Sequence, residues 1–433
     1  MTTRVSARTI LGLGAPALGA LAADPVLSLV DTAFVGRIGA EPLAALGIDA
    51  AIFGFAFAAF NFLAYATTPL VARARGKADM AEAAAVVRQA HTLAVVIGLG
   101  ALGVLVVAAP LLVGLFDPEP AVVEPAITYL RIRALATPAF LVVTAGHGSF
   151  RGLQDTRTTM YITLAVNLVN AVLDPLLMFG AGWGLAGAAI ATLAAQWIGA
   201  GAFVVLLARR AAGEGWRLGL TRLGETRALL RVGWVLILRT MLLVASLGVA
   251  TGVASRIGTV EVAAHQIVSQ VWFLLAMIVD AVAIAAQVLV ADQAGRSGVP
   301  SVRPLADQLH RWGLAAGVVL AGAVWLAGGL VASLSTDQHV REAVLTVVPI
   351  AAAMQPVAAL LFVSDGVYMA LVEMRRLAWS TGAGFLATLA VGGATLARGW
   401  GLAGVWWAMS AMVASRFLVL AAGYRSMFSD VSA

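Results

Sequence analysis

The hexapeptide GWGLAG occupies residues 182–187 and returns, letter for letter, at residues 399–404, a shift of 217 residues. In the same way GRIGAEPLAAL at 36–46 aligns with SRIGTVEVAAH at 255–265, at a shift of 219. Three pairs of single residues match at shifts of 218 or 219: Gly76 with Gly295, Asn61 with Asp280, and Pro138 with Pro356. A nearly constant shift over most of the chain indicates two similar halves.

The chain around these motifs is strongly apolar. Of its 433 residues, 61% are hydrophobic and 12% are charged, and the mean hydropathy is +0.94. A single soluble core stops growing near ~250–300 residues, whereas a helix needs about 20 apolar residues to cross a bilayer. The apolar stretches are continuous, without the alternation of a transmembrane β-barrel strand. We therefore predict an all-α polytopic membrane protein.

Twelve transmembrane helices are predicted, and the repeat groups them into two six-helix lobes. The expected lobes cover residues 1–208 and 232–433, joined by an arginine-rich cytoplasmic linker at 209–231. Because six is even, both lobes enter the membrane in the same sense, so a pseudo-two-fold axis should lie along the membrane normal. The predicted spans are roughly 9–36, 43–72, 84–114, 121–148, 158–180, 185–208, 228–254, 262–291, 306–333, 342–369, 377–397 and 402–424.

Positive charges are distributed unevenly between the two sets of connections. Twenty Lys and Arg residues lie on the side of the N-terminus, and four lie in the opposite connections. Because positive charges are retained on the cytoplasmic side, both termini are expected to be cytoplasmic in a multi-pass protein of the cell inner or plasma membrane. The arginines are spread over short loops, so nucleic acid is not an expected partner. We expect a monomer whose partners are the lipid bilayer and small molecules.

Four polar residues of the N-terminal half lie at membrane depth. Asn170 and Asp174 are four residues apart and share one helix face. At 1.5 Å per residue, Asp31, Asp174 and Thr192 lie at similar depths, roughly 8–10 Å from the outer ends of their spans. Polar groups at this depth usually serve a cavity or a partner. Two neighbouring carboxyl groups should share a proton, and the same oxygens would suit Na⁺. We predict an ion-coupling site of Asp31, Asn170, Asp174 and Thr192; the alternative is that Asn170 and Asp174 only hold helices together.

A second group of polar residues is a candidate lining for a substrate cavity. Asp24 lies two helical turns before Asp31 on the same stripe, although it could instead cap a kink at Pro25. The candidates for this lining are Asp24, Asn61, Asn167 and Asp280.

Arg239, Asp280 and Asp365 fall at similar depth in the C-terminal lobe and are predicted to form a charge cluster. A structural role is favoured for this cluster, with substrate or proton handling as the alternative. No P-loop, zinc signature or dinucleotide-binding motif is present, so no cofactor beyond a coupling H⁺ or Na⁺ is expected. No pattern of paired residues suggests an enzyme.

Motifs along the whole chain carry a family resemblance. They resemble the multidrug and toxic compound extrusion (MATE) family, and the motifs of the second half resemble its DNA-damage-inducible protein F (DinF) branch. The motifs are SLVDTAFVGRIG (28–39), NFLAYATTPLVA (61–72), FRGLQDTRT (150–158), NAVLDP (170–175), GLAGAAIAT (184–192), LILRT (236–240), AAHQI (263–267), MIVDAVAIAAQ (277–287) and QPVAALLFVSDG (355–366).

The resemblance implies export of amphipathic, often cationic compounds, driven by entry of H⁺ or Na⁺ through alternating access. It implies that Asp31 is the central coupling acid, that Asn170, Asp174 and Thr192 belong to the same site, and that Pro16 is a helix-bending proline. Pro25 is a second position where the first helix could bend. The alternative within the same superfamily is a lipid-linked oligosaccharide flippase, which would need arginines in the central cavity; the candidates are Arg131, Arg133, Arg239 and Arg416.

Four positions depart from the family pattern. Gln287 stands where relatives often carry Glu, His147 where an Asn is expected, and Asp49 where a small or neutral residue is usual. The seventh span has Arg239 and lacks the acid of sodium-coupled members. A sodium site in the C-terminal lobe is therefore not expected, and H⁺ is favoured over Na⁺ as the coupling ion.

Overall fold

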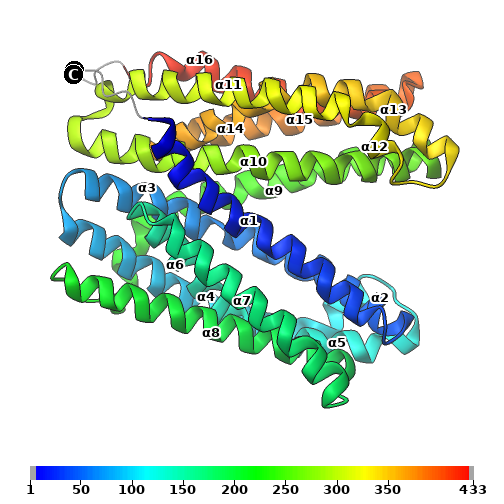
Figure 1. The fold of residues 1–433 in the computed structure, drawn as a ribbon, viewed down its shortest axis with the longest axis horizontal. Helices are drawn as coiled ribbons and strands as arrows, with labels where there is room; N and C mark the ends of the chain where they lie inside the picture. Colours follow the sequence, from blue (N-terminus) through cyan, green and yellow to red (C-terminus); the bar gives the residue numbers. More distant parts are fainter. Residues whose placement is uncertain (1–5, 429–433) are drawn as a thin grey trace. The chain divides into compact units, whose positions relative to one another are not determined.

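The computed structural model describes residues 6–428, and this part of the chain is helical without a β-strand (Figure 1). The α-helices are α1 (Ala7–Val35), α2 (Ala40–Phe60), α3 (Phe62–Gly76), α4 (Met80–Gly114), α5 (Pro120–Ala134), α6 (Thr137–Gly152), α7 (Thr156–Pro175), α8 (Gly184–Gly213), α9 (Arg227–Ile257), α10 (Thr259–Ser297), α11 (Arg303–Leu326), α12 (Gly328–Ala332), α13 (Gln338–Ala353), α14 (Gln355–Ala370), α15 (Met374–Arg398) and α16 (Gly401–Tyr424). Three short helices complete the list: the π-helix η1 (Leu176–Gly180) and the 3₁₀-helices η2 (Leu223–Thr226) and η3 (Val299–Val302).

The predicted number of membrane spans is confirmed. Ten helical segments are individually long and apolar enough to cross a bilayer. Two further spans are bent pairs: α5 with α6, at 48°, and α13 with α14, at 49°. Counting each pair once gives twelve spans, as the hydropathy of the sequence predicts.

The two bends occupy equivalent positions in the repeat. Pro138 begins α6 and Pro356 begins α14, each within the first two helical positions, where a missing backbone N–H costs least. A glycine of the preceding span packs against each proline. A Cβ added at Gly98 would lie 2.6 Å from the Pro138 Cα, and one at Gly317 would lie 2.7 Å from the Pro356 Cα. The two bends are thus built by the same helix contact.

The repeated GWGLAG motif forms the same turn in both halves. Its first two glycines have positive φ, +72° and +51° at Gly182 and Gly184, and +66° and +59° at Gly399 and Gly401. Side chains with a Cβ rarely adopt this conformation. The last glycine of the second copy, Gly404, comes so close to α15 that a Cβ would lie 2.5 Å from Thr395. Backbone geometry therefore explains why the motif recurs unchanged.

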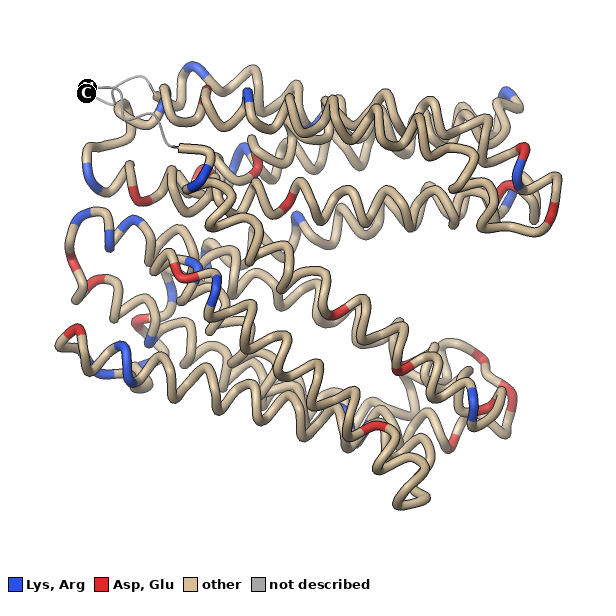
Figure 2. The backbone as a smooth tube through the Cα atoms, in the orientation of Figure 1, with Lys and Arg blue, Asp and Glu red and all other residues tan. Residues whose placement is uncertain are grey.

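The chain divides into two compact units. The N-lobe contains residues 15–237, and the C-lobe contains residues 6–14 and 238–428. The divisions fall inside α1 and α9, whereas the sequence-based boundaries were placed at 208 and 232. In Figure 2, Lys and Arg of the N-lobe gather at one end of its helices, in the α3–α4, α6–α7 and α8–η2 connections.

Each lobe has its own packing. In the N-lobe, α2 packs on α5, α3 and α4 pack on α6, and α7 packs on α8. In the C-lobe, α14 contacts α10, α11 and α16, and α15 pairs with α16. Large apolar side chains also point outward, for example Val107 and Leu326, which are 81% and 87% exposed. Such outward apolar faces are what a helix in contact with lipid presents.

Candidate functional site in the N-lobe

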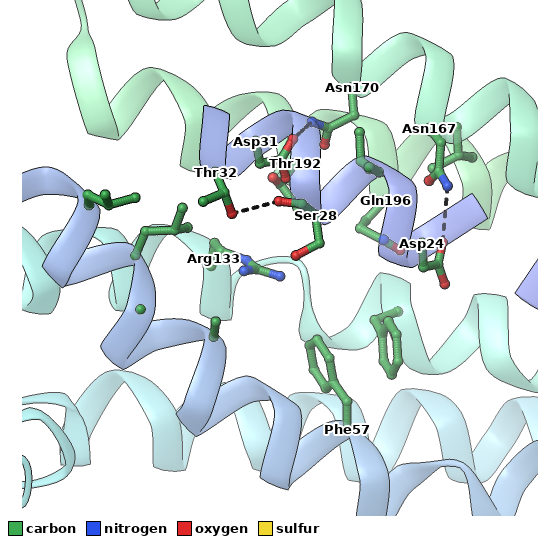
Figure 3. A pocket seen from close by; sticks show the side chains of 17 residues that line it. Asp24, Ser28, Asp31, Thr32, Phe57, Arg133, Asn167, Asn170, Thr192 and Gln196 are labelled. Atoms are coloured by element: carbon green, nitrogen blue, oxygen red, sulfur yellow. Dashed lines mark hydrogen bonds between the residues drawn. The ribbon is translucent and has the colours of Figure 1, made fainter. Parts of the chain in front are cut away.

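A cavity of about 280 Å³ lies in the N-lobe, where the N-lobe part of α1 faces α2, α5, α7 and α8 (Figure 3). We call it the N-lobe cavity. Its wall is polar on the side of α1, α7 and α8 and apolar on the side of α2. The polar side chains that carry the argument below are Asp24, Asp31, Arg133, Asn167, Asn170 and Thr192.

Asp31, Asn170 and Asp174 meet at one end of this cavity, as the sequence predicts. The Asn170 Nδ2 group donates to Asp174 Oδ2 at 2.7 Å and to Asp31 Oδ1 at 3.4 Å. The side chains of Asp31 and Asp174 also interact directly with each other. Asn170 and Asp174 are 1% and 0% exposed, whereas Asp31 is half-buried and lines the cavity. We call these three residues the coupling cluster.

Thr192 lines the cavity without a recorded hydrogen bond to the coupling cluster. Its hydroxyl donates to the Ala188 carbonyl, at 3.1 Å, within its own helix. The hydroxyl group of a threonine in a helix commonly donates its hydrogen bond to a backbone carbonyl one turn earlier. The predicted membership of Thr192 in the ion-coupling site therefore remains a prediction.

The local structure of α7 holds the cluster in place. Asp155 caps the start of α7 by accepting a hydrogen bond from the Thr158 N–H at 3.0 Å. At the other end, α7 stops at Pro175, directly after Asp174, and continues as the π-helix η1. Short π-helical turns are frequent at functional sites. The carboxyl group of Asp174 thus stands where the regular helix ends.

Asp24 and Asn167 form a second polar contact along α1. The Asn167 Nδ2 group donates to Asp24 Oδ1 at 3.1 Å. Both side chains also line a neighbouring cavity of about 210 Å³, together with Asn61 and His147. His147 Nε2 lies 3.2 Å from the Thr163 hydroxyl. Three of the four predicted substrate-cavity residues, Asp24, Asn61 and Asn167, therefore line these two neighbouring cavities of the N-lobe.

The fourth candidate, Asp280, lies on α10 in the C-lobe and does not line either of these cavities. The C-lobe instead contains a buried charge cluster around Asp365. Its Oδ2 atom accepts from Arg239 Nη2 at 2.5 Å and from Arg416 Nη2 at 2.6 Å. The exposed fractions are 3% for Asp365, 9% for Arg239 and 4% for Arg416. Two of the three residues of the predicted charge cluster, Arg239 and Asp365, therefore form an ion pair, and Arg416 is a further member.

Sequence reasoning missed two arginines as members of these sites. Arg416 lies inside the last apolar span, and a charged residue at membrane depth is the sequence feature that could have identified it as a site residue. Arg133 lies at the end of α5, next to the bend, and lines the N-lobe cavity beside Asp31. Both had been noted only as possible flippase arginines. Among residues 6–428, no group of three or more His, Asp or Glu side chains is arranged to hold a metal ion.

Comparisons with known proteins agree with this architecture. The MatE family model matches residues 16–176 and 236–392, once in each half. The chain is 34% identical to Protein DETOXIFICATION 44, chloroplastic, of Arabidopsis thaliana, over 94% of this chain and 80% of that protein. It is 28% identical to DNA damage-inducible protein F of Escherichia coli (strain K12), over 93% and 88%. A MOP superfamily transporter from Pyrococcus furiosus shares the fold with a TM-score of 0.87 at 19% identity, over 97% and 95% of the two chains.

Proposed function

Because the chain belongs to the MatE family of membrane transporters, we propose that it is a secondary exporter of amphipathic, often cationic small molecules in exchange for protons. We place it in the inner or plasma membrane as a monomer, with both termini in the cytoplasm. The proposal combines the family with one feature of the N-lobe, the contact between Asp31 and Asp174.

This contact supports proton coupling. Two neighbouring carboxyl groups, of which Asp174 is fully buried, cannot both carry a charge without a penalty, so one shared proton stabilises the pair. The Asn170 amide group donates to both carboxyl groups and holds them together. The other oxygen of Asp174, Oδ1, is buried and accepts no hydrogen bond from residues 6–428, which leaves an atom available to carry the proton. Uptake of that proton removes one negative charge from the cavity wall.

The orientation of the neighbouring groups favours a proton over sodium. A sodium ion needs several oxygen atoms that point to one centre. In the coupling cluster, Asn170 presents its NH₂ group to the carboxyl groups, and the Thr192 hydroxyl donates to its own helix. A proton needs only the carboxyl pair itself.

In the proposed cycle, a proton and a cationic substrate compete for the N-lobe carboxyl groups. The substrate binds from the cytoplasm while the Asp31–Asp174 pair is charged. A proton that enters from outside then protonates the pair and weakens its attraction for the substrate. The N-lobe part of α1 carries both Asp24 and Asp31. Pro16 and Pro25 lie inside this helix and remove backbone hydrogen bonds there, so they are the positions where it could bend.

The test is transport of tetraphenylphosphonium, a permanent lipophilic cation, in proteoliposomes with pH and sodium gradients imposed separately. Export should follow a pH gradient, acidic outside, in sodium-free buffer. Asp31→Asn should reduce this transport at least about tenfold while the protein remains folded. Asp117→Asn, at an exposed loop carboxylate, is the matched control.

Two results would overturn the proposal. One is transport that follows a sodium gradient and ignores the pH gradient. The other is undiminished pH-driven transport by the Asp31→Asn variant. The flippase alternative is not favoured, because the N-lobe cavity holds one arginine beside the carboxyl groups of Asp24 and Asp31.

A further inference from the structure

Asp49 is a buried carboxylate that the proposed cycle does not use. It lies on α2 and is 0% exposed. Both of its carboxyl oxygens are buried and have no hydrogen-bond partner among the described residues. A buried carboxylate is normally paired or hydrogen-bonded, because an isolated charge in a low-dielectric interior is very unfavourable. Asp49 therefore needs a counter-charge whenever it is ionised.

Arg133 is the cation that faces Asp49. Its guanidinium carbon lies 4.7 Å from the centre of the Phe53 ring, one helical turn after Asp49 on α2, and 5.8 Å from the centre of the Tyr129 ring. The aromatic faces attract the cation without fixing it in one direction. Figure 3 shows the guanidinium group directed into the N-lobe cavity, near Ser28 of α1. Arg133 thus lines the cavity, and its guanidinium group packs on a ring that lies one helical turn from Asp49.

The charges around Arg133 are unbalanced. It acts electrostatically on Asp49 of α2, on Asp31 of α1 and on Asp174 of α7. Within residues 6–428, no carboxylate lies within ion-pairing distance of Arg133. The remaining titratable group beside it is Tyr129 of its own helix. The α8 side chains of the cavity wall, Thr192 and Gln196, are neutral.

The neighbouring Arg131 does not share this position. Its Nε group donates to the Val106 carbonyl of α4 at 3.4 Å. Arg133 is therefore the arginine of the N-lobe cavity wall that acts on these three carboxyl groups.

We propose that Arg133 is an internal counter-ion that alternates between the Asp31–Asp174 pair and Asp49. When the pair has neither a proton nor a bound cation, Arg133 turns toward it. When a proton or a cationic substrate neutralises the pair, Arg133 turns away and pairs with Asp49. Arg133 is thus a built-in competitor of cationic substrates, and Asp49 is the position that withdraws it. The competition rests on the proposed function, whereas the pairing of Arg133 with Asp49 does not.

The pairing is tested by a double-mutant cycle on thermal stability in detergent. Arg133→Gln leaves Asp49 buried without a counter-charge, so it should lower the melting temperature. Adding Asp49→Asn should restore most of the loss, because the charge that needed Arg133 is then absent. Arg131→Gln is the matched control and should show no such dependence on Asp49. Losses that simply add in the double variant would overturn the pairing; if Arg133→Gln does not fold, Arg133→Met is measured in its place with and without Asp49→Asn.

The competition is tested by equilibrium binding of tetraphenylphosphonium to the purified protein at neutral pH. Asp49→Asn should weaken binding, on the order of tenfold, because Arg133 then has only the coupling pair as a partner. Arg133→Gln should tighten binding, and adding Asp49→Asn to it should have no further effect. Two results would overturn the competition. One is that Asp49→Asn weakens tetraphenylphosphonium binding equally in the unmodified protein and in the Arg133→Gln variant. The other is that Arg133→Gln binds tetraphenylphosphonium more weakly than the unmodified protein. If the unmodified protein does not bind tetraphenylphosphonium, both the proposal of a cationic substrate and the proposed competition are overturned. The double-mutant cycle on thermal stability still tests the pairing of Arg133 with Asp49.

Discussion

At the residue scale, the carboxyl group of Asp365 is the centre of the C-lobe charge cluster. One oxygen accepts from both Arg239 and Arg416, so Asp365 is the ion-pair partner of two guanidinium groups away from water. Removing one arginine leaves Asp365 paired with the other, whereas removing the carboxylate takes this ion-pair partner from both arginines. The consequences of the three changes must therefore differ.

We expect Asp365→Asn to be the most destabilising change in this cluster, by about 3–5 kcal/mol. Arg239→Met and Arg416→Met should each cost less, because the remaining arginine still neutralises Asp365. Thermal unfolding of the purified variants in one detergent measures the order. A larger loss from either arginine variant than from Asp365→Asn would show that Asp365 is not the shared counter-charge.

At the element scale, the bent fourth span of each lobe rests on a glycine of the third span. The approach of Gly98 to Pro138 and of Gly317 to Pro356 leaves no room for a methyl group, since the nearest atoms belong to the backbone. Overpacking of this kind forces helices apart. The bend of 48–49° therefore depends on two small residues outside the bent helices themselves.

Gly98→Ala and Gly317→Ala should each destabilise the protein by about 1–3 kcal/mol. Gly100→Ala is the control in the same helix, because a Cβ there would meet nothing within 4 Å. This control should be neutral or slightly stabilising, since alanine favours a helix more than glycine does. Melting temperatures that fall equally for Gly98→Ala and Gly100→Ala would contradict the close approach to Pro138.

At the scale of the whole molecule, the two lobes share a repeat but differ in buried charge. The N-lobe gathers carboxyl groups around Asn170, whereas the C-lobe places two arginines on Asp365. Both lobes were expected to enter the membrane in the same sense, with the arginine-rich connections in the cytoplasm. That orientation is open to direct measurement, because the chain contains no cysteine.

Single cysteines introduced at Gly219 and at Thr336 should report opposite sides of the membrane. Both positions are exposed, and they lie in connections that the charge bias assigns to the cytoplasm and to the outside, respectively. A membrane-impermeant maleimide added to intact cells should label Thr336→Cys, and it should label Gly219→Cys only after the membrane is opened. Labelling of Gly219→Cys in intact cells would reverse the orientation.

Several features were open to prediction because they depend on neighbours in the chain. The apolar stretches predict twelve spans, since the cost of exposing a backbone to lipid leaves a helix as the only local solution. Asn170 and Asp174 must share a face at a spacing of four, so their contact follows from the helix period alone.

The sequence by itself therefore determined the spans, the repeat and the polar pair on α7. Only the tertiary structure decided which distant charges meet. Arg416 reaches Asp365 from another helix, and Arg133 lines the same cavity as Asp31, whereas Thr192 bonds to its own backbone. The reason is physical: the helix period gives the depth and the face of a residue, but the rotation of each helix and the rotamer of each long side chain are set by packing against neighbours that lie far away in the chain.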